Sequence, residues 1–388
     1  MAAIPLSYNL RNLVVRWKNT LMTAVSIALV VAVFIIIMSL AQGLRTAFTS
    51  TGNPHNLLVL RKGSNSETTS FITMEQFQIL KNLQGVDLLK TGEPMVTGEL
   101  LTLMNLPRKD GKTANVIIRG VLPNTFSIRD GVTLNKGQFF KSGLRECIVS
   151  KTLASRFKNM EIGDSLRIGK GYYKVVGHFD AQGTAFGSEI WADIHQVGAD
   201  FDRPEYSNTI LRVSDPNQIQ KLIRRIDNDR SLSLNARPEP EYYAEQTKTA
   251  LPIQIFGSFL AVIMSIGAVF AALNTMYAAV ANRTREIGTL RVLGFTPLNI
   301  MVSFMFESIL LSLIGGILGC LFSLPIDGLA TGTVNFDTFS EIAFNFRITP
   351  ILLGKGILFS LFIGFMGGVL PSIYAARRPV ISALRELE

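Results

Sequence analysis

The sequence is poor in the residues from which enzymes, metal sites and disulfide frameworks are built. It holds two cysteines and three histidines among 388 residues. Cys147 and Cys320 leave no disulfide framework, and the histidines are scattered rather than placed at metal-ligand spacing. The motifs G-x-x-x-x-G-K-[ST], H-E-x-x-H and G-x-S-x-G do not occur in it. The sequence therefore predicts no catalytic, metal or cofactor-binding residue, and we expect that the chain is not an enzyme.

Charge is scarce as well. Charged residues make up 17 % of the chain and hydrophobic residues 48 %, which is too apolar for an average soluble protein. The apolar residues gather in four runs, Leu21–Leu40, Ile253–Ala281, Ile300–Leu324 and Ile351–Ala376. A helix of about 20 residues rises roughly 30 Å and crosses the hydrocarbon layer. A cleaved secretory signal is the alternative for the first run, but signal cores have only about 7–15 residues. Four transmembrane helices are predicted.

Basic residues near the ends of these runs predict the orientation. Residues 1–20, 282–299 and 377–388 carry more Lys and Arg than Asp and Glu, a bias that is typical of cytoplasmic segments. We therefore expect both termini in the cytoplasm, with 43–250 and 325–350 outside the inner membrane. The net charge of +9 follows from this topology, and no segment is basic enough to indicate nucleic-acid binding.

The N-terminal segment has a helical pattern of its own. Leu6, Leu10, Leu13, Val14 and Trp17 share one face, as in a helix that lies on a membrane surface; a disordered basic N-terminus is the alternative.

These observations divide the chain into nine predicted segments. They are a cytoplasmic amphipathic helix (1–20), the first span (21–42), an extracytoplasmic domain (43–250), the second span (251–281), a cytoplasmic coupling helix or loop (282–299), the third span (300–324), an extracytoplasmic loop (325–350), the fourth span (351–376) and a cytoplasmic tail (377–388).

Residues 43–250 alternate strand-like and helix-like patterns, which predicts an α+β domain, in two lobes because of its length. Segments rich in β-branched or aromatic residues predict strands at 56–60, 115–121, 147–150, 165–168, 172–179 and 209–213. Helices are predicted at 74–83, 151–158 and 216–227, the last capped by Asp215.

The predicted spans contain two features that stand out from their apolar background. The pairs Gly315 with Gly319 and Gly364 with Gly368 have the spacing of small residues at helix contacts in lipid. They are expected to pack within the bundle or against a second subunit. Glu307 lies seven residues into its run. It is either a polar latch that pairs across the bundle, or a carboxylate that stays protonated or reaches toward the headgroups.

The segment "ANRTREIGTLRVLGF" between the second and third runs is densely charged for this chain. It predicts a short helix with Glu286 near Arg283 and an apolar stripe of Ile287, Leu290 and Leu293, closed by Gly294 and Pro297. Such a helix between two spans is a lever, because whatever grips it moves both. A simple positive-inside loop is the alternative, and it requires the arginines but not the stripe.

Three stretches of the chain resemble the FtsX-like permease family of ATP-binding-cassette systems, which includes the macrolide-exporter and lipoprotein-releasing types. They are "NTMYAAVANRTREIGTLRVLGFTPLNI" (274–300), "FMFESILLSLIGGILG" (304–319) and "LPSIYAARRPVISALREL" (370–387). The stretches "CIVSKTLASRF", "YYKVVGHFDAQG" and "IWADI" resemble the family's periplasmic core domain more loosely. The resemblance covers nearly the whole chain, but the fused N-terminal ATPase of the macrolide-exporter type is missing.

The resemblance implies a permease subunit that transmits motion to its outer domain to export or extract a substrate. It implies a dimer of permeases and a separate ATPase dimer that binds the ATP and Mg. The residues carried over as the ATPase-coupling element are Arg283, Arg285, Glu286, Ile287, Gly288, Leu290 and Gly294. A periplasmic adaptor and an outer-membrane channel are further expected partners, besides membrane lipid. The alternative is a regulatory scaffold that activates a periplasmic partner such as a cell-wall hydrolase.

Overall fold

The computed structural model describes residues 11, 15, 17–335 and 338–378. Within them the chain forms two compact units. We call them the helical unit, which comprises the described residues up to 42 with 252–328 and 346–378, and the α/β domain, which comprises 43–251 and 329–345. Apart from Trp17, the residues that define the predicted membrane-surface helix lie outside the described residues, as does most of the predicted tail.

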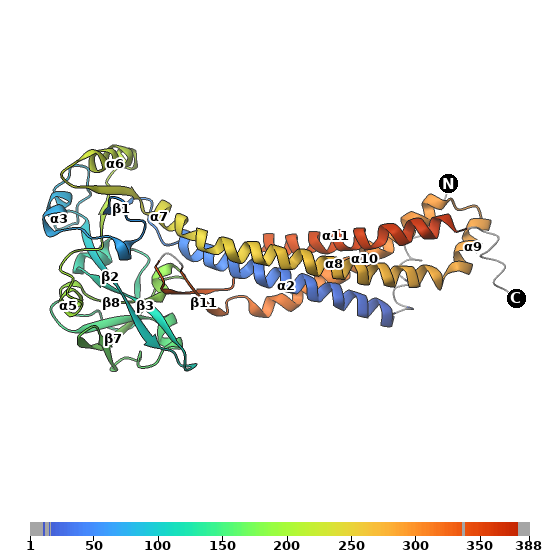
Figure 1. Cartoon of the computed structure of the whole chain (residues 1–388), viewed down its shortest axis with the longest axis horizontal. Coiled ribbons are helices and arrows are strands. Elements are labelled where there is room, and N and C mark those ends of the chain that lie inside the picture. Colours follow the sequence, from blue (N-terminus) through green and yellow to red (C-terminus); the bar gives the residue numbers. More distant parts are fainter. Residues whose placement is uncertain (1–10, 12–14, 16, 336–337, 379–388) are drawn as a thin grey trace. The chain divides into compact units, whose positions relative to one another are not determined.

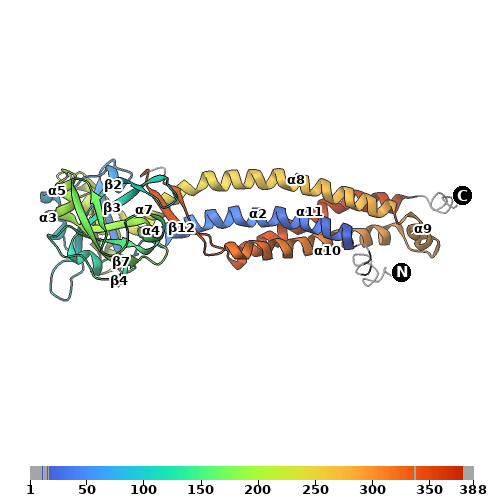
Figure 2. The same ribbon diagram turned by 90° about the horizontal axis from the view of Figure 1, so that it is seen from below.

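The helical unit is built from four long apolar helices that run side by side (Figures 1 and 2). They are α2 (Trp17–Thr49), α8 (Leu251–Ala281), α10 (Pro297–Ser323) and α11 (Pro350–Arg377). All four are long and apolar enough to cross a membrane. The buried side chains of Ile27, Val31, Leu311 and Ile363 form part of their common core. The prediction of four transmembrane helices is therefore confirmed.

The first helix is longer than its apolar run. Helix α2 continues from Leu40 to Thr49, into the part of the chain that belongs to the α/β domain. Leu44, Ala47 and Phe48 are buried there, and their spacing of three and four residues is that of a helix with one covered face. Hydropathy alone ends the run early, because Gln42, Gly43 and Arg45 follow it.

The α/β domain is built around one mixed sheet of ten strands. The strands are β1 (Asn56–Arg61), β2 (Val96–Pro107), β3 (Thr113–Val121), β4 (Thr133–Gly137), β5 (Glu146–Ser150), β6 (Ser165–Ile168), β7 (Gly171–Asp180), β8 (Glu189–Asp193), β9 (Asn208–Arg212) and β10 (Leu234–Pro238). Their order is β10-β1-β9-β2-β3-β8-β5-β7-β4, with β6 paired to β7. The pairs β3–β8 and β5–β7 are parallel, and the other pairs are antiparallel.

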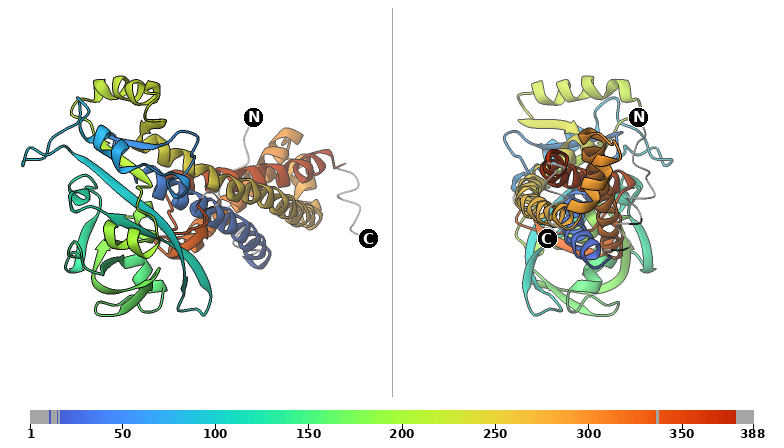
Figure 3. Two further views of the ribbon diagram at one scale, coloured as in Figure 1. Left: turned by 60° about the vertical axis from the view of Figure 1, so that its left-hand side comes forward. Right: turned by 90° about the vertical axis from the view of Figure 1, so that its right-hand side faces the viewer.

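Five helices accompany the sheet: α3 (Met74–Lys81), α4 (Lys151–Arg156), α5 (Ile194–Asp200), α6 (Ile219–Asn228) and α7 (Glu239–Gln246). Figure 3 shows α6 beside strand β10, where the carboxylate of Asp227 accepts a hydrogen bond from the backbone N–H of Ala236 at 2.8 Å. The six predicted strands and three predicted helices are all present, except that 216–218 form a 3-10 turn before α6. The prediction of two lobes is wrong, because one continuous sheet makes the domain a single compact unit.

A short hairpin that the sequence analysis did not predict also belongs to the α/β domain. Its strands are β11 (Ala330–Val334) and β12 (Glu341–Asn345), and they lie in the segment that was expected to be a loop. Ile342, Ala343 and Phe344 of β12 are buried, whereas the residues of β11 are half-buried or exposed. The segment connects α10 and α11, which means that the domain has a second covalent link to the spans.

Candidate functional site

The segment between α8 and α10 forms the short helix α9 (Thr284–Val292). Gly294 ends it with a φ of +92°, a backbone conformation that glycine adopts without strain. The N–H of Phe295 donates to the carbonyl of Leu290 at 3.1 Å, which closes the turn. The side chain of Thr296 then caps α10 by accepting from the N–H of Asn299. The helix and its stop are therefore encoded locally, as the sequence predicts.

One face of α9 is buried and the other is exposed. Ile287 is 2 % exposed and packs in a cluster with Phe304 and Met276, and Gly288 is buried too. Leu290 is half-buried, whereas Arg285 and Glu286 are exposed. Leu293 is 70 % exposed, so the predicted apolar stripe is shorter than expected. The reason is that the helix ends at Val292, and Leu293 already belongs to the turn.

Arg283 does not lie on the surface of this segment. Its side chain is 3 % exposed, and its Nη1 lies 2.6 Å from Oε2 of Glu307 on α10. The guanidinium also stands over the ring of Phe304 at 5.3 Å, and its Nε lies 3.4 Å from Glu286. Glu307 is itself 6 % exposed. It pairs with a residue outside its own helix, as the first of its two interpretations, the polar latch, predicts. Breaking one side of such a buried pair costs about 3–5 kcal/mol.

The four glycines of the predicted packing motifs lie at helix contacts within the chain. A Cβ on Gly315 would stand 2.8 Å from Cβ of Ile27, and one on Gly319 would stand 2.8 Å from Cβ of Val31, both on α2. A Cβ on Gly368 would stand 2.7 Å from Cβ of Ser308. The hydroxyl of Ser308 donates to the carbonyl of Gly364 at 2.7 Å. Gly315 and Gly319 of α10 therefore lie against α2, and Gly364 and Gly368 of α11 lie against α10.

The α/β domain contains a buried cluster of charged side chains that the sequence analysis missed. Its members, each at most 5 % exposed, are Glu67, Glu99, Arg119, Arg129, Glu189 and Glu239. We call this cluster the carboxylate network. A signal for it exists in the sequence, since Glu99 and Arg119 interrupt the apolar strands "TGELLTL" and "NVIIRGV". Charges inside buried strands are rarely unpaired, but their partners come from other strands and are not readable.

Arg119 and Arg129 are the centres of this network. Nε and Nη2 of Arg119 donate to the two oxygens of Glu189 at 2.6 and 2.7 Å, and Nη1 contacts Glu99 and Glu67. Nε and Nη2 of Arg129 donate to the two oxygens of Glu99, both at 2.8 Å. Such two-pronged pairs are strong and fix orientation.

The network also joins the ends of the chain segments that connect the domain to the spans. Arg129 pairs with Glu239 at the start of α7. The carboxylate of Glu239 accepts hydrogen bonds from the N–H of Asn53 at 3.1 Å and from the side chain of Asn56 at 2.8 Å. Residues 50–56 follow α2, and α7 precedes α8. The entry and exit of the chain are thus held together inside the domain.

The β11–β12 hairpin is fixed by a second charged contact. Glu341, which is 5 % exposed, pairs with Arg156 on α4 and, at 3.4 Å, with Arg108 after β2. The hydroxyl of Ser188 accepts from the backbone N–H of Ala343 at 2.6 Å. These contacts come from a segment whose two ends continue into α10 and α11. The hairpin can therefore move with the domain only if its tethers to the spans allow it.

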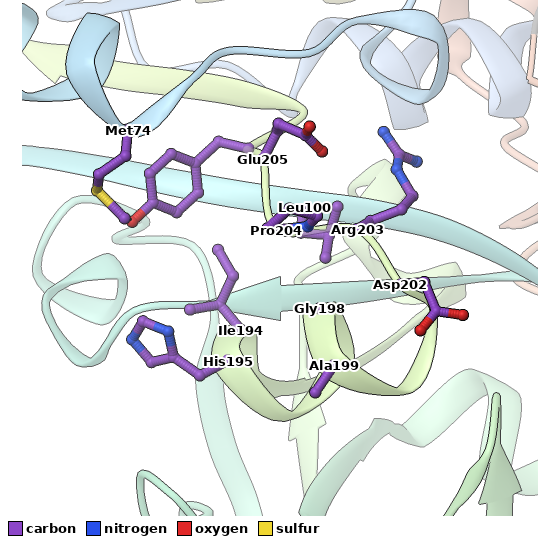
Figure 4. Close-up of a pocket in the computed structure, with 11 residues that line it drawn as sticks. Met74, Leu100, Ile194, His195, Gly198, Ala199, Asp202, Arg203, Pro204 and Glu205 are labelled. Atoms are coloured by element: carbon purple, nitrogen blue, oxygen red, sulfur yellow. The ribbon is translucent and has the colours of Figure 1, made fainter.

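The α/β domain also has a cavity of about 430 Å³ at its surface. Figure 4 shows it between α5, the residues that follow α5, and Met74. Leu100, Ile194 and Tyr206 line it with apolar surface, and His195 and Glu205 stand at its edge. The combination is suited to an amphipathic ligand or a partner side chain.

Comparisons with known proteins decide the family. The family model of the MacB-like periplasmic core domain matches residues 20–229, which is more than half of the chain. The model of the FtsX-like permease C-terminal region matches residues 258–380. The chain belongs to the MacB and FtsX-like permeases. It is therefore an ABC transporter permease, a membrane protein with a large extracellular domain.

Several curated relatives resemble this FtsX-like permease. It is 25 % identical over 401 residues to the ABC transporter permease YknZ of Bacillus subtilis, with 95 % of each chain covered. It is 24 % identical to the macrolide export ATP-binding/permease protein MacB of Acinetobacter baylyi, covering 83 % of this chain and 49 % of MacB. For MacB of Bordetella avium the identity is 27 %, covering 75 % and 46 %. The permease thus spans about half the length of these MacB proteins.

Two solved structures overlap with parts of the permease. The extracellular domain of YknZ has a TM-score of 0.37 and 18 % identity, covering 47 % of this chain and 99 % of that one. The periplasmic region of MacB from Actinobacillus actinomycetemcomitans has a TM-score of 0.38 and 10 % identity, covering 50 % and 92 %. The assignment rests on the family models. It confirms the family and fold class that the sequence predicts, and it implies an ATPase partner.

Proposed function

We propose that this permease couples ATP hydrolysis by a separate ATPase subunit to movement of its α/β domain, which exports or extracts a substrate. ATP and Mg are bound by the partner, α9 and both termini face the cytoplasm, and two permease chains work together. The substrate is taken from the periplasm or the outer leaflet, and an adaptor and an outer-membrane channel are further partners. The proposal goes beyond the family assignment, because it names the segment through which the ATPase moves the α/β domain.

The observation that carries this proposal is the way in which α9 is held. Its buried face packs on α8 and α10 through Ile287, and Arg283 at its start pairs with Glu307 inside the helices. The opposite face presents Arg285 and Glu286. A partner that binds the exposed face therefore pushes on a helix that cannot shift without α10. Arg283, Ile287 and Gly288 serve this role from inside, so only part of the predicted coupling element is available for direct contact.

Recovery of the ATPase subunit tests the proposal. Glu286→Lys reverses an exposed charge on α9, and we expect it to lower the amount of ATPase that co-purifies with the permease at least several-fold. Glu161→Lys makes the same change at an exposed site of the α/β domain and should leave recovery unchanged. Equal recovery with both variants would count against α9 as the docking element.

Labelling of intact cells tests the orientation separately. A cysteine at Arg285 should be protected from a membrane-impermeant maleimide, whereas one at Lys158 in the α/β domain should react. Native Cys147 is buried, and Cys320 can be replaced by Ala beforehand. Reaction at position 285 in unbroken cells would reverse the proposed topology and end the proposal.

The regulatory scaffold remains a second candidate. The buried carboxylate network favours neither candidate, since both require a rigid outer domain. A variant with intact ATPase recovery can be assayed for cell-wall hydrolysis and for substrate efflux in the same strain. Loss of hydrolysis alone after deletion of the chain would support the scaffold, and loss of efflux alone would support transport.

A further inference from the structure

The carboxylate network holds more negative charges than positive ones. Four carboxylates face two guanidinium groups, so two negative charges remain if all six groups are ionised. Charge without compensation is strongly disfavoured in a protein interior. A buried carboxylate in this position takes up a proton rather than stay ionised. One proton halves this excess, and the donors that each carboxylate has decide which of the four takes it.

Glu67 and Glu99 are the two carboxylates that share donors. Nη1 of Arg119 contacts both, and so does the side-chain amide of Asn208, at 3.1 Å from Glu99. Two acids that share donors in this way lie close together, and each opposes the ionisation of the other. Glu99 has two further hydrogen bonds from Arg129, which Glu67 lacks. The proton therefore belongs to Glu67.

Within the described part of the chain, Arg119 and Arg129 are the cations that act on Glu67. The titratable groups that face it come from β2, β3, β8, the residues after the 3-10 turn at 123–127, and α7, and they are Glu99, Arg119, Glu189, Arg129, Tyr242 and Tyr243. Across a small cavity stands Glu341 of the hairpin, which is already paired with Arg156 and Arg108. Among the described residues, no group of three or more His, Cys, Asp or Glu side chains is placed to hold a metal ion.

The same cavity has room for a water molecule that can supply the proton of Glu67. It measures about 30 Å³, and Glu67 and Tyr243 both line it, which is enough room for one water molecule. The hydroxyl of Tyr243 is buried and has no hydrogen-bond partner among the described residues. A buried hydroxyl of this kind calls for a polar partner. Glu67 thus borders a small cavity that the polar side chains of Tyr243 and Ser340 also line.

We propose that Glu67 is a proton-binding site inside the α/β domain, and that the proton it holds keeps the carboxylate network closed. Loss of the proton adds a negative charge that repels Glu99 and competes with it for Arg119, which weakens the pairing of Glu99 with Arg119. Because Arg129 links Glu99 to Glu239, the weakening reaches the place where the entry and exit of the chain are held together. The proposal concerns the domain alone, so its failure would leave the proposed coupling to an ATPase untouched.

The direction of the pH effect follows from burial. Burial raises the pKa of Glu67, an effect that Arg119 opposes and Glu99 reinforces. Burial also acts on Glu99, but Arg129 and Arg119 outweigh it and lower the pKa of Glu99 to about 2. The folded domain therefore binds the proton of Glu67 more tightly than the unfolded chain does. This stabilisation is complete below the unfolded pKa of Glu67 and is lost as the pH rises through its higher folded pKa.

Thermal unfolding of the full-length chain in detergent tests the proposal. The chain has two tryptophans, and Trp191 is buried and donates to Glu189 at 2.8 Å, so Trp17→Phe leaves a fluorescence reporter inside the network. We expect the wild-type midpoint to fall by several degrees as the pH rises from about 5 to about 9. Glu67→Gln, which imitates the protonated acid, should remove most of this fall, and Glu99→Gln should lower the midpoint at every pH.

Infrared spectroscopy supplies a readout that does not depend on a variant folding. The wild-type chain should show the C=O band of a buried protonated carboxyl near neutral pH, and the band should disappear as the pH rises over the range in which the midpoint falls. Glu67→Gln should lack the band, whereas Glu341→Gln, a control at the same cavity, should keep it. An absent wild-type band, or Glu67→Gln and wild type with the same pH dependence of the midpoint, would overturn the proposal.

Discussion

The two units bury charge in different ways. In the helical unit the buried Arg283 meets one buried glutamate, Glu307, and the pair joins two elements that are close in sequence. In the α/β domain two arginines meet four glutamates from several strands and turns. The first is a buried ion pair between the start of a short helix and a span. The second is a centre on which much of the domain converges.

The difference follows from what each unit needs. A transmembrane helix satisfies its own backbone, so the bundle can be held by apolar packing, small residues and one pair that fixes α9. The sheet domain must also hold the entering and leaving segments side by side. There Gly52 permits close approach, since a Cβ on it would stand 2.6 Å from Cα of Pro240. Apolar side chains should therefore be able to replace the buried ion pair of the helical unit but not the carboxylate network of the α/β domain.

The largest effect is expected from Arg119→Met. This change keeps the length of the side chain but leaves Glu67, Glu99 and Glu189 without their shared cation. Removing one partner of a single buried pair already costs about 3–5 kcal/mol, and here three buried carboxylates lose a partner. We expect the domain to fail to fold, seen as loss of the Trp191 signal and of soluble yield in detergent. Lys158→Met, at an exposed site, is the control. Near-normal stability of Arg119→Met would mean that the network is not a structural centre.

A smaller effect, and a recovery, is expected at the helical pair. Arg283→Met should destabilise the chain by about 3–5 kcal/mol, because it leaves Glu307 buried and unpaired. The double variant Arg283→Met with Glu307→Leu should recover most of that loss, since apolar replacement of a whole buried pair is often neutral. Thermal unfolding followed by size-exclusion chromatography measures both. If the double variant were as unstable as the single one, the contrast between the two units would be lost.

The same double variant separates stability from coupling. If Arg283 and Glu307 serve only to hold α9 rigid, the double variant, whose stability is restored, should also co-purify with the ATPase subunit. Stability without ATPase recovery would assign the charges themselves a part in docking. Wild type and Glu161→Lys provide the reference levels.

How much the sequence could predict differs between the units for the same reason. The spans, the stop at Gly294 and the spacing of Gly315 with Gly319 are local patterns, and each is found in the structure. The burial of Arg283 could not be read from its own segment, because it depends on Glu307, which lies 24 residues further along. The sequence therefore predicts Arg283 only as a cytoplasmic charge near Glu286, and it names no partner for Glu307.

The α/β domain was less predictable because its decisive contacts are between distant segments. Strands β2, β4, β8 and β10 were missed. Gly98 and Glu99 lie within β2, and Glu189 and Asp193 stand at the ends of β8; these residue types are depleted in strands. Gly98 makes room for the ring of Tyr206, which would lie 2.8 Å from a Cβ there. Glu99 and Glu189 pair with Arg119, and Asp193 caps α5. The β11–β12 hairpin was missed because its anchor, Glu341, has its partners at Arg108 and Arg156.

The smallest effect is expected where the helices approach most closely, and it measures how far packing alone holds the bundle. Gly315→Ala places a Cβ at 2.8 Å from Cβ of Ile27, and overpacking of this kind costs about 1–3 kcal/mol. Gly267→Ala is the matched control, since a Cβ there meets no atom within 4 Å, and alanine is the better helix former by about 1 kcal/mol. The thermal midpoint should fall for the first and stay level or rise for the second. A loss at Gly315 larger than that of Arg283→Met would make helix packing, rather than the ion pair, the determinant of the helical unit.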